Sequence, residues 1–153
     1  MSPAKPSPPT VVTRHVATSP ERVFAVVCDA WLIPVWLVGA AHIRDVDVEW
    51  PSVGARLHHS IGAWPLLISD STEVVEIEPP RRIVLRARMW PAGEAMVEMR
   101  FEPHESGCTV VMTERAARGP AFWVDNPVQR LLLRHRNVES LARLAAVAEK
   151  RRA

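Results

Sequence analysis

The chain has 153 residues, of which 48% are hydrophobic and 24% are charged, so its composition is that of a folded globular domain and not of a disordered chain. No apolar run approaches the roughly 18 residues that a transmembrane helix needs. The proline-rich start lacks the hydrophobic stretch of a secretory signal. A net charge of +2 is too small to indicate nucleic-acid binding. We therefore expect a cytoplasmic protein without a membrane span and without a nucleic-acid partner.

The common cofactor and metal motifs are missing from the sequence, which contains no GxGxxG, GxxxxGK(S/T), HExxH or GxSxG. The two cysteines, Cys28 and Cys108, are far apart and belong to no CxxC pair, so neither a zinc site nor a disulfide is expected. The histidines and cysteines do not show the spacing of metal ligands. We therefore expect no metal and no cofactor.

The sequence predicts a short disordered tail ahead of one domain. Residues 1–10 hold four prolines and show no apolar periodicity, and proline favours an extended chain. Residues 11–17 are rich in β-branched side chains, which favour a first strand. Residues 11–150 are expected to form a single domain.

Two short helices are expected next. Ser19 suits an N-cap, Pro20 fits the first helical turn, and the carboxylate of Glu21 complements the positive end of the helix dipole. Pro34 interrupts the apolar stretch that follows, so a second, separate helix is predicted over residues 31–38.

From about residue 42 the apolar pattern changes to a period of two, which is typical of strands. Turn residues such as proline and glycine separate the segments, and such short connections indicate an antiparallel meander. The predicted strands are residues 43–50, 55–61, 66–78, 82–90, 94–102 and 108–116.

The chain is expected to end in one long amphipathic helix, with Asn126 as its cap and Pro127 as its first residue. Laid across a curved seven-stranded antiparallel sheet, this helix would cover the apolar face of the sheet, while the two short helices roof the open end. The sequence therefore predicts an α+β fold with an internal cavity. The apolar residues at helical spacing are Val128, Leu131, Leu132, Val138, Leu141, Leu144, Ala145 and Ala148.

Five local sequences are also informative. They are the helix start from Ala17 to Phe24 with Asp29, Pro34-Val35-Trp36, Gly54-Ala55-Arg56, the corner from Val74 to Arg82, and Gly107 to Val111. In this order they resemble the Bet v 1-like (START-like, helix-grip) superfamily and, within it, the bacterial polyketide cyclase/dehydrase family, over roughly residues 11–150. The resemblance implies a helix-grip fold with a hydrophobic cavity. It leaves the activity open, because the superfamily includes aromatase/cyclases, lipid and sterol carriers, quinone-binding proteins and hormone receptors.

Strand alternation indicates which side chains face the helix. Arg86 and Arg88 fall on the opposite face, where an ion pair with Glu98 is expected. An inward Arg86 is the alternative, since cavity arginines are known in the cyclase relatives. The apolar candidates for cavity lining and ligand binding are Leu57, Ile61, Leu85, Met89, Val97, Met99, Val110, Met112 and Leu131.

Six tryptophans are an unusual feature of the composition. Trp36, in the family-like Pro-x-Trp, is expected to pack beneath the helical roof and to contact ligand. Trp64, Trp90, Phe122 and Trp123 lie in predicted connections, where a monomer rarely leaves aromatic surface bare. They are expected either to ring the cavity entrance, with Phe122-Trp123 as a gate, or to form a homodimer interface.

Glu114, His59 and His135 are the candidates for proton transfer. Glu114 shares a strand face with Val110 and Met112, and an inward carboxyl group held against apolar walls can act as a general acid. A solvated or arginine-paired Glu114 is the alternative. His59 is expected to point inward. His135 falls on the apolar seam of the long helix, where core packing is the alternative to catalysis.

The favoured function is the binding of a hydrophobic small molecule, such as a lipid, polyketide or other aromatic metabolite, in the cavity. The first alternative is an enzyme of the cyclase or dehydratase type, in which Glu114, His59 or His135 transfers protons to an oriented chain. The second alternative is a protein-interaction or quinone-chaperone-like module. Apolar lining without a convergent acid–base pair favours binding over catalysis.

Overall fold

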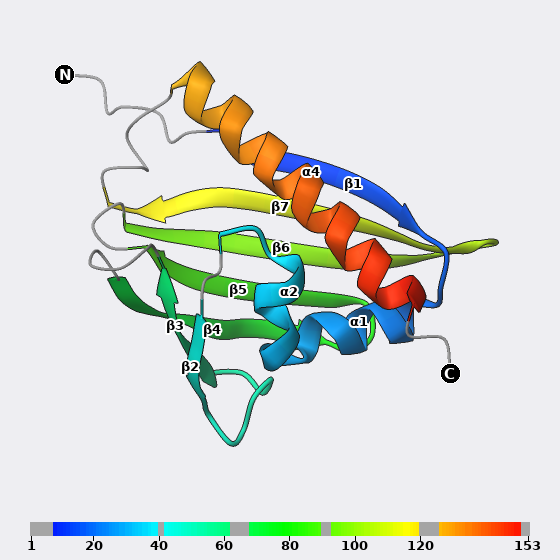
Figure 1. Cartoon of the computed structure of the whole chain (residues 1–153), viewed down its shortest axis with the longest axis horizontal. Helices are drawn as coiled ribbons and strands as arrows, with labels where there is room; N and C mark the ends of the chain where they lie inside the picture. Colours follow the sequence, from blue (N-terminus) through cyan, green and yellow to red (C-terminus); the bar gives the residue numbers. More distant parts are fainter. Residues whose placement is uncertain (1–7, 40–41, 62–67, 90–92, 120–125, 151–153) are drawn as a thin grey trace.

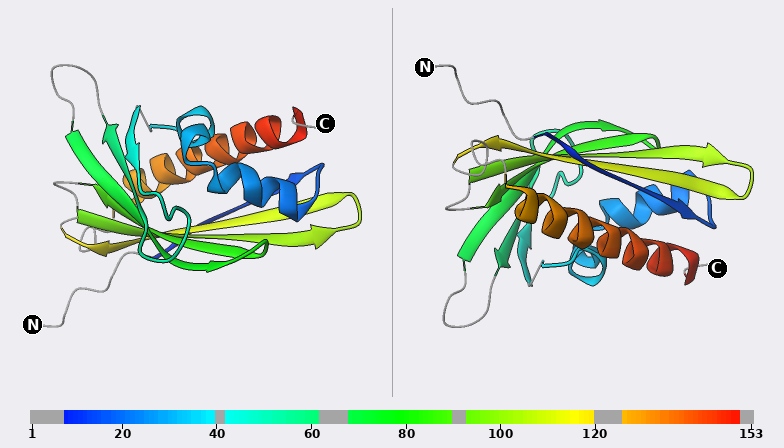
Figure 2. Two further views of the ribbon diagram at one scale, coloured as in Figure 1. Left: turned by 90° about the horizontal axis from the view of Figure 1, so that it is seen from below. Right: turned by 90° about the horizontal axis from the view of Figure 1, so that it is seen from above.

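The computed structural model of the chain describes residues 8–39, 42–61, 68–89, 93–119 and 126–150. Figure 1 shows a curved antiparallel sheet with a long helix lying across it. In the side views of Figure 2, the described helices form a second layer on one face of the sheet. The predicted α+β helix-grip architecture is therefore confirmed.

Within the described residues, seven strands form one sheet in the order β1-β7-β6-β5-β4-β3-β2, and all neighbouring strands are antiparallel. The meander from β2 to β7 agrees with the prediction, and β1 joins the outer edge of β7. Register shifts in the β2–β3, β4–β5 and β6–β7 pairs mark bulges, which bend and twist a sheet. The strands are β1 (Thr10–Val16), β2 (His42–Val46), β3 (Arg56–Ile61), β4 (Ile68–Glu78), β5 (Arg82–Met89), β6 (Gly93–His104) and β7 (Gly107–Arg118).

Two predicted boundaries near the start of the chain were wrong. β2 ends at Val46 instead of residue 50, because the chain turns there: the Trp50 backbone N–H donates to the Asp47 carbonyl at 3.0 Å. Thr10 pairs with Glu114 in β1, so the strand begins inside the segment that was expected to be a tail. Residues 1–7 of that tail lie outside the described residues.

Two short helical segments follow β1, as predicted. α1 (Pro20–Cys28) is capped by Ser19, whose hydroxyl accepts a hydrogen bond from the Arg22 backbone N–H at 3.3 Å. The second segment is shorter than expected and consists of a 3-10 turn, η1 (Ala30–Leu32), and one turn of α-helix, α2 (Ile33–Trp36). These elements lie beside α4 on the same face of the sheet (Figure 1).

The long helix, α4 (Pro127–Lys150), begins as predicted, because the Asn126 side chain accepts a hydrogen bond from the Val128 backbone N–H at 2.9 Å. The predicted buried seam was correct only in the second half of the helix, where Leu141, Leu144, Ala145 and Ala148 are buried together with Asn137 and Ser140. The apolar residues expected to be buried before that point, Val128, Leu131, Leu132 and Val138, are 63%, 67%, 63% and 42% exposed.

The physical reason lies in helix geometry. An α-helix turns by about 100° per residue, so Val128 and the fully buried Asn137, nine residues apart, lie on opposite sides of α4. The two apolar stripes of the helix therefore point in different directions. Only the second stripe meets the core, in which Phe24 of α1 packs edge to face on Phe101 of β6 with ring centres 5.5 Å apart. Among the described helices, none combines the length and the hydrophobicity that a membrane crossing requires.

Candidate functional site

A cavity of about 330 Å³ lies between the concave face of the sheet and the helices. Its walls are mostly apolar and come from α1, α2, α4 and the strands β2 to β7. Strand alternation explains the lining, because Leu85 and Ala87 on β5, and Val97 and Met99 on β6, are two residues apart and share one face. The polar residues that border the cavity are His59, Asp70, Thr72, Arg88, Glu114 and Arg136.

The carboxylate of Glu114 is the most deeply buried charged group of this set, with only 3% of the residue exposed. The side-chain amide of Asn137 donates a hydrogen bond to its Oε2 at 2.8 Å. The Arg136 guanidinium lies 3.3 Å and 3.4 Å from the two carboxylate oxygens. Glu114 comes from β7 and its partners from α4, so this cluster ties the long helix to the sheet beside the cavity. A buried carboxylate needs such donors, because burying an unpaired charge is costly.

His59 of β3 forms a second polar group in the cavity wall. Its Nε2 lies 3.1 Å from the hydroxyl oxygen of Thr72 on β4, and Asp70 is its direct cross-strand neighbour. Burial lowers the pKa of the imidazole from its ordinary value of 6.5, because the charged form loses hydration, while the nearby Asp70 carboxylate acts in the opposite sense. The imidazole is therefore neutral at physiological pH and available as a hydrogen-bonding group.

This lowered pKa makes stability depend on pH in a defined direction. As the pH falls below 6.5, the unfolded chain takes up a proton on His59 before the folded protein does, so the folded state loses stability. We expect the free energy of unfolding, measured with urea from about pH 7 down to about pH 5, to fall less steeply in His59→Gln than in the wild type. The exposed His42→Gln is the matched control and should keep the wild-type slope. Equal slopes in His59→Gln and the wild type would contradict this expectation.

A sequence model of the family described as "Polyketide cyclase / dehydrase and lipid transport" matches residues 9–149. The chain belongs to this family. The family resemblance stated from the local motifs is thereby confirmed. No curated protein matches the sequence.

Solved structures support the fold of this polyketide cyclase/dehydrase family member. A protein from Rhodobacter sphaeroides has a TM-score of 0.74 at 21% identity, with 94% of this chain and 93% of that chain covered. A protein from Chromobacterium violaceum has a TM-score of 0.70 at 20% identity, covering 93% of this chain and 98% of that chain. The di-domain ARO/CYC protein StfQ from the steffimycin biosynthetic pathway has a TM-score of 0.73 at 14% identity. That match covers 94% of this chain and 51% of StfQ.

The structure brings many of the sequence-predicted site residues of this family member to the cavity. His59 and Glu114 border it, and so do the apolar candidates Trp36, Leu57, Leu85, Val97, Met99 and Met112. Other candidates fall outside the described residues: Trp64, Trp90, Phe122, Trp123 and the side chains of Ile61 and Met89. Their roles at an entrance or at a dimer interface stay predictions.

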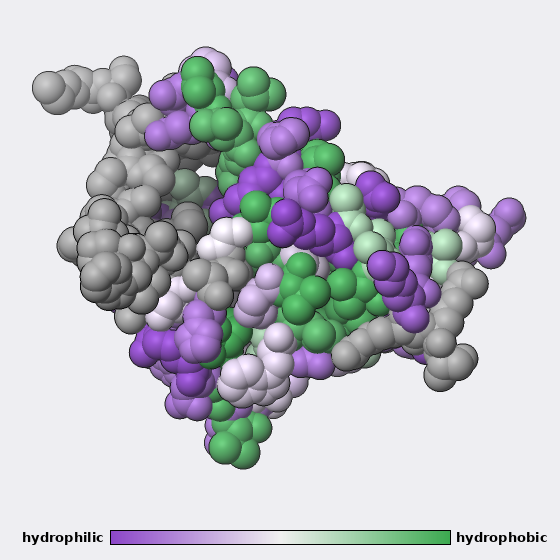
Figure 3. Space-filling model, in the orientation of Figure 1, coloured by the Kyte–Doolittle hydropathy of each residue, from purple (hydrophilic) through white to green (hydrophobic). Residues whose placement is uncertain are grey.

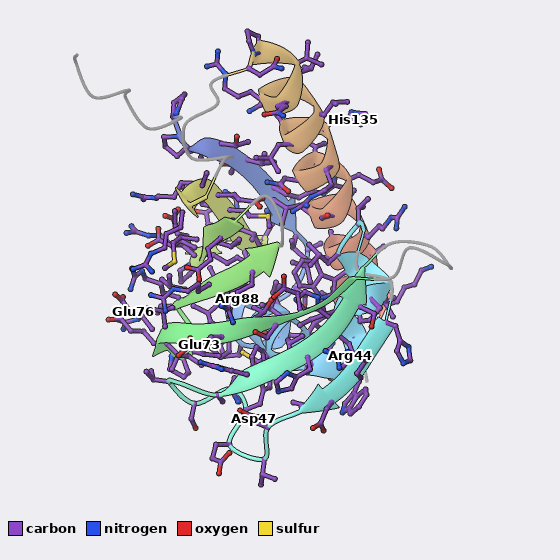
Figure 4. The ribbon with its side chains drawn as sticks, turned by 90° about the vertical axis from the view of Figure 1, so that its left-hand side faces the viewer. Arg44, Asp47, Glu73, Glu76, Arg88 and His135 are labelled. Atoms are coloured by element: carbon purple, nitrogen blue, oxygen red, sulfur yellow. The ribbon has the colours of Figure 1, made fainter. Side chains whose placement is uncertain are left out.

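Three candidates do not line the cavity. Val110 is fully buried, but it belongs to the core. Leu131 is 67% exposed, and His135 points away from the sheet on the outer side of α4 (Figure 4). The expected positions of Leu131 and His135 on a buried seam were wrong, because they belong to the outward stripe of the helix.

The expected charged outer face of the sheet is present, but with different pairs. Arg86 lies 3.6 Å from Glu73 and 3.8 Å from Glu94, so the alternative of an inward Arg86 was wrong. Figure 4 shows Glu73 and Glu76 on this outer side of the sheet. Glu98 does not pair with Arg86 or Arg88; it accepts hydrogen bonds from Arg82 at 2.7 Å and Arg100 at 2.9 Å.

Sequence reasoning missed five polar residues at or next to the cavity, one of which, Arg88, was expected only on the outer face of the sheet. Asp70 and Thr72 are two residues apart on β4, so strand alternation was a usable signal for them. Arg136 and Asn137 carried no such signal, because the apolar pattern of α4 suggested a different buried face. Only the position of Glu114 on β7 explains why a fully buried asparagine is suitable at residue 137.

Proposed function

We propose that the protein binds a small hydrophobic molecule, with one or two polar groups, in the cavity between the sheet and α4. The observation that carries this proposal is an apolar cavity of about 330 Å³ with a few polar groups in its wall. Ligand sites typically have volumes of about 300–1,000 Å³, apolar walls and a small number of placed polar groups. The volume lies at the small end of that range, which favours a compact ligand over a long lipid chain.

The polar groups define where the ligand's own polar atoms would lie. Neutral His59 and the hydroxyl of Thr72 can exchange hydrogen bonds with a hydroxyl or carbonyl group. The Glu114 carboxylate accepts hydrogen bonds, and the Arg136 guanidinium beside it donates them. A ligand with a hydroxyl or carbonyl group near each of these sites would satisfy both, while its apolar body contacts residues such as Leu57 and Met99.

A cyclase or dehydratase-type reaction is the second candidate, because His59 and Glu114 border the same cavity. In that reaction neutral His59 would accept a proton, and the walls would hold a reactive chain in a folded shape. Binding is favoured over catalysis, because Glu114 already accepts hydrogen bonds from Asn137 and Arg136. The groups around its carboxylate are donors and not a base that faces a substrate. The protein-interaction alternative has no support from the cavity.

Native mass spectrometry of the protein purified from its own host tests the proposal. We expect a retained small molecule of low polarity at a stoichiometry of one per chain. The delipidated protein should then bind the fluorescent probe 1-anilinonaphthalene-8-sulfonate saturably, and the extracted molecule should displace the probe. A protein that retains nothing and binds the probe without saturation would contradict the proposal. Turnover of the extracted molecule would favour the enzyme.

A further inference from the structure

One buried hydrogen-bond donor beside the cavity has no acceptor in the described part of the chain. Trp36, the last residue of α2, borders the cavity and is only 3% exposed. Among the described residues, its indole Nε1–H is the only buried side-chain N or O group that lacks a hydrogen-bond partner. A buried donor without an acceptor lowers stability, and such groups are rare in folded proteins. The cavity that Trp36 borders is a place from which an acceptor can come.

The other two described tryptophans do not share this condition. The Trp50 Nε1–H donates a hydrogen bond to the Cys28 carbonyl oxygen at 2.8 Å. Trp31 is 63% exposed and in contact with solvent. Trp36 has neither arrangement, because the rest of α2 is Ile-Pro-Val and carries no polar side chain. Figure 3 shows hydrophobic surface gathered where the short helices meet α4. The helix layer around Trp36 is therefore poor in groups that could accept its N–H.

The charges around the cavity favour a neutral acceptor over an anion at this position. The two arginines that border the cavity are already paired, since Arg136 lies 3.3 Å from Glu114 and Arg88 lies 3.7 Å from Glu94. The imidazole in the wall is neutral at physiological pH, as described above. An anionic group beside Trp36 would therefore be buried without a cation of its own, which is costly. A carbonyl oxygen accepts a hydrogen bond without carrying a net charge.

We propose that the ligand is a carbonyl compound whose neutral oxygen accepts a hydrogen bond from the Trp36 indole. This inference rests on the proposed function, because it assigns a polar contact to a molecule bound in the same cavity. Neighbouring atoms cover the indole nitrogen, so the indole turns to meet the oxygen. Such a turn is feasible because the outer side-chain torsion of tryptophan has a broad energy profile. α2 belongs to the helix layer (Figure 2), so the carbonyl group faces the helices and not the hydrogen-bonding groups of β3 and β4.

Two compounds of nearly the same shape test this contact. 2-Acetylnaphthalene has a carbonyl oxygen where 2-isopropenylnaphthalene has a methylene carbon. Isothermal titration calorimetry measures the affinity of each compound for the wild type and for Trp36→Phe, which keeps an aromatic ring and removes the N–H. We expect Trp36→Phe to weaken binding of the ketone about tenfold more than binding of the hydrocarbon, the effect of one lost hydrogen bond. Comparing the two losses cancels the different transfer of the compounds from water. The exposed Trp31→Phe is the matched control and should leave both affinities unchanged.

A second measurement uses the wild-type protein alone. In protein labelled with nitrogen-15 at the indole nitrogens, the ketone should move the Trp36 N–H proton signal to higher frequency, because hydrogen bonding deshields the proton. The hydrocarbon should move this signal much less.

The inference is overturned if Trp36→Phe weakens binding of both compounds equally, or if the ketone shifts the Trp36 signal no more than the hydrocarbon does. Either result leaves the proposed function in place, because both compounds still bind. Absence of ketone binding also overturns the inference. Only if saturable binding of 1-anilinonaphthalene-8-sulfonate is absent as well does the proposed function fail with it.

Discussion

Replacing Asn137 with leucine is expected to lower the free energy of unfolding by about 2–4 kcal/mol. The Asn137 amide donates a 2.8 Å hydrogen bond to Glu114, a carboxylate that is only 3% exposed. Leucine has a similar size, so the loss arises from the unpaired acceptor and not from a void. Leaving a buried charged acceptor without its donor costs about 1–3 kcal/mol or more, and breaking a buried pair costs up to about 5. Urea unfolding monitored by tryptophan fluorescence measures the change.

A double-mutant cycle distinguishes this explanation from a general disturbance of the helix. Removing both partners, in Glu114→Leu/Asn137→Leu, should restore much of the lost stability, because no buried polar group is then left unpaired. Glu139→Ala is the matched control: this exposed glutamate of α4 pairs with Arg143 at 3.2 Å, and its loss should cost about 0.3–0.5 kcal/mol. If Asn137→Leu had no effect, the role assigned to this cluster would be wrong.

Replacing Ala87 with tryptophan is expected to weaken binding of 1-anilinonaphthalene-8-sulfonate at least about 100-fold. Ala87 lines the cavity from β5, next to Leu85 on the same face, so a large side chain there occupies the space that a ligand needs. The lost contacts correspond to one or two apolar groups at about 1.5–3 kcal/mol each. Fluorescence titration measures the affinity.

Two further variants make the cavity experiment decisive. Ala87→Leu fills less of the cavity and should give an intermediate loss of probe affinity. It also serves as the test if the tryptophan of Ala87→Trp strains the core, which would cost about 1–3 kcal/mol. Val48→Trp adds the same aromatic group to a side chain that is 97% exposed outside the cavity, so it should leave probe affinity unchanged. Unchanged affinity in both Ala87 variants, with thermal unfolding showing a folded protein, would locate the probe elsewhere.

Strand periodicity was the most informative signal in the sequence. In an extended strand successive side chains alternate between the two faces of the sheet. Once the face of one residue is known, the faces of the other residues of that strand follow. This rule assigned Leu57, Leu85, Val97, Met99 and Met112 to one side of the sheet, and all five line the cavity. Capping residues were equally informative, because Ser19 and Asn126 act on backbone groups only two or three residues away. These interactions are local, and local sequence is sufficient to predict them.

The orientation of α4 was not predictable in this way, because the helix carries two apolar stripes with the same period. The sequence alone gives no reason to bury Leu141 and Leu144 and to expose Leu131 and Leu132. Which of the two stripes is buried depends on residues that are distant in the sequence. Asn137 is bonded to Glu114, 23 residues away, and Ser140 to the backbone of Val38, 102 residues away. Polar residues at a buried seam are recognisable only when those distant partners are known.

The division of α4 into two halves has a consequence for how sequences of this kind can diverge. From Asn137 onward a substitution at one of the inward positions, such as Leu141 or Leu144, disturbs the core, so few replacements are tolerated at those positions. In the first half of α4 the outward side chains are largely exposed. Exchanging them therefore changes the surface and leaves the stability of the protein nearly constant. One continuous helix thus combines a conservative segment with a freely variable one. A chain with this architecture can change the outer surface of α4 by substitutions at the outward positions of its first turns, while the cavity and the sheet stay as they are.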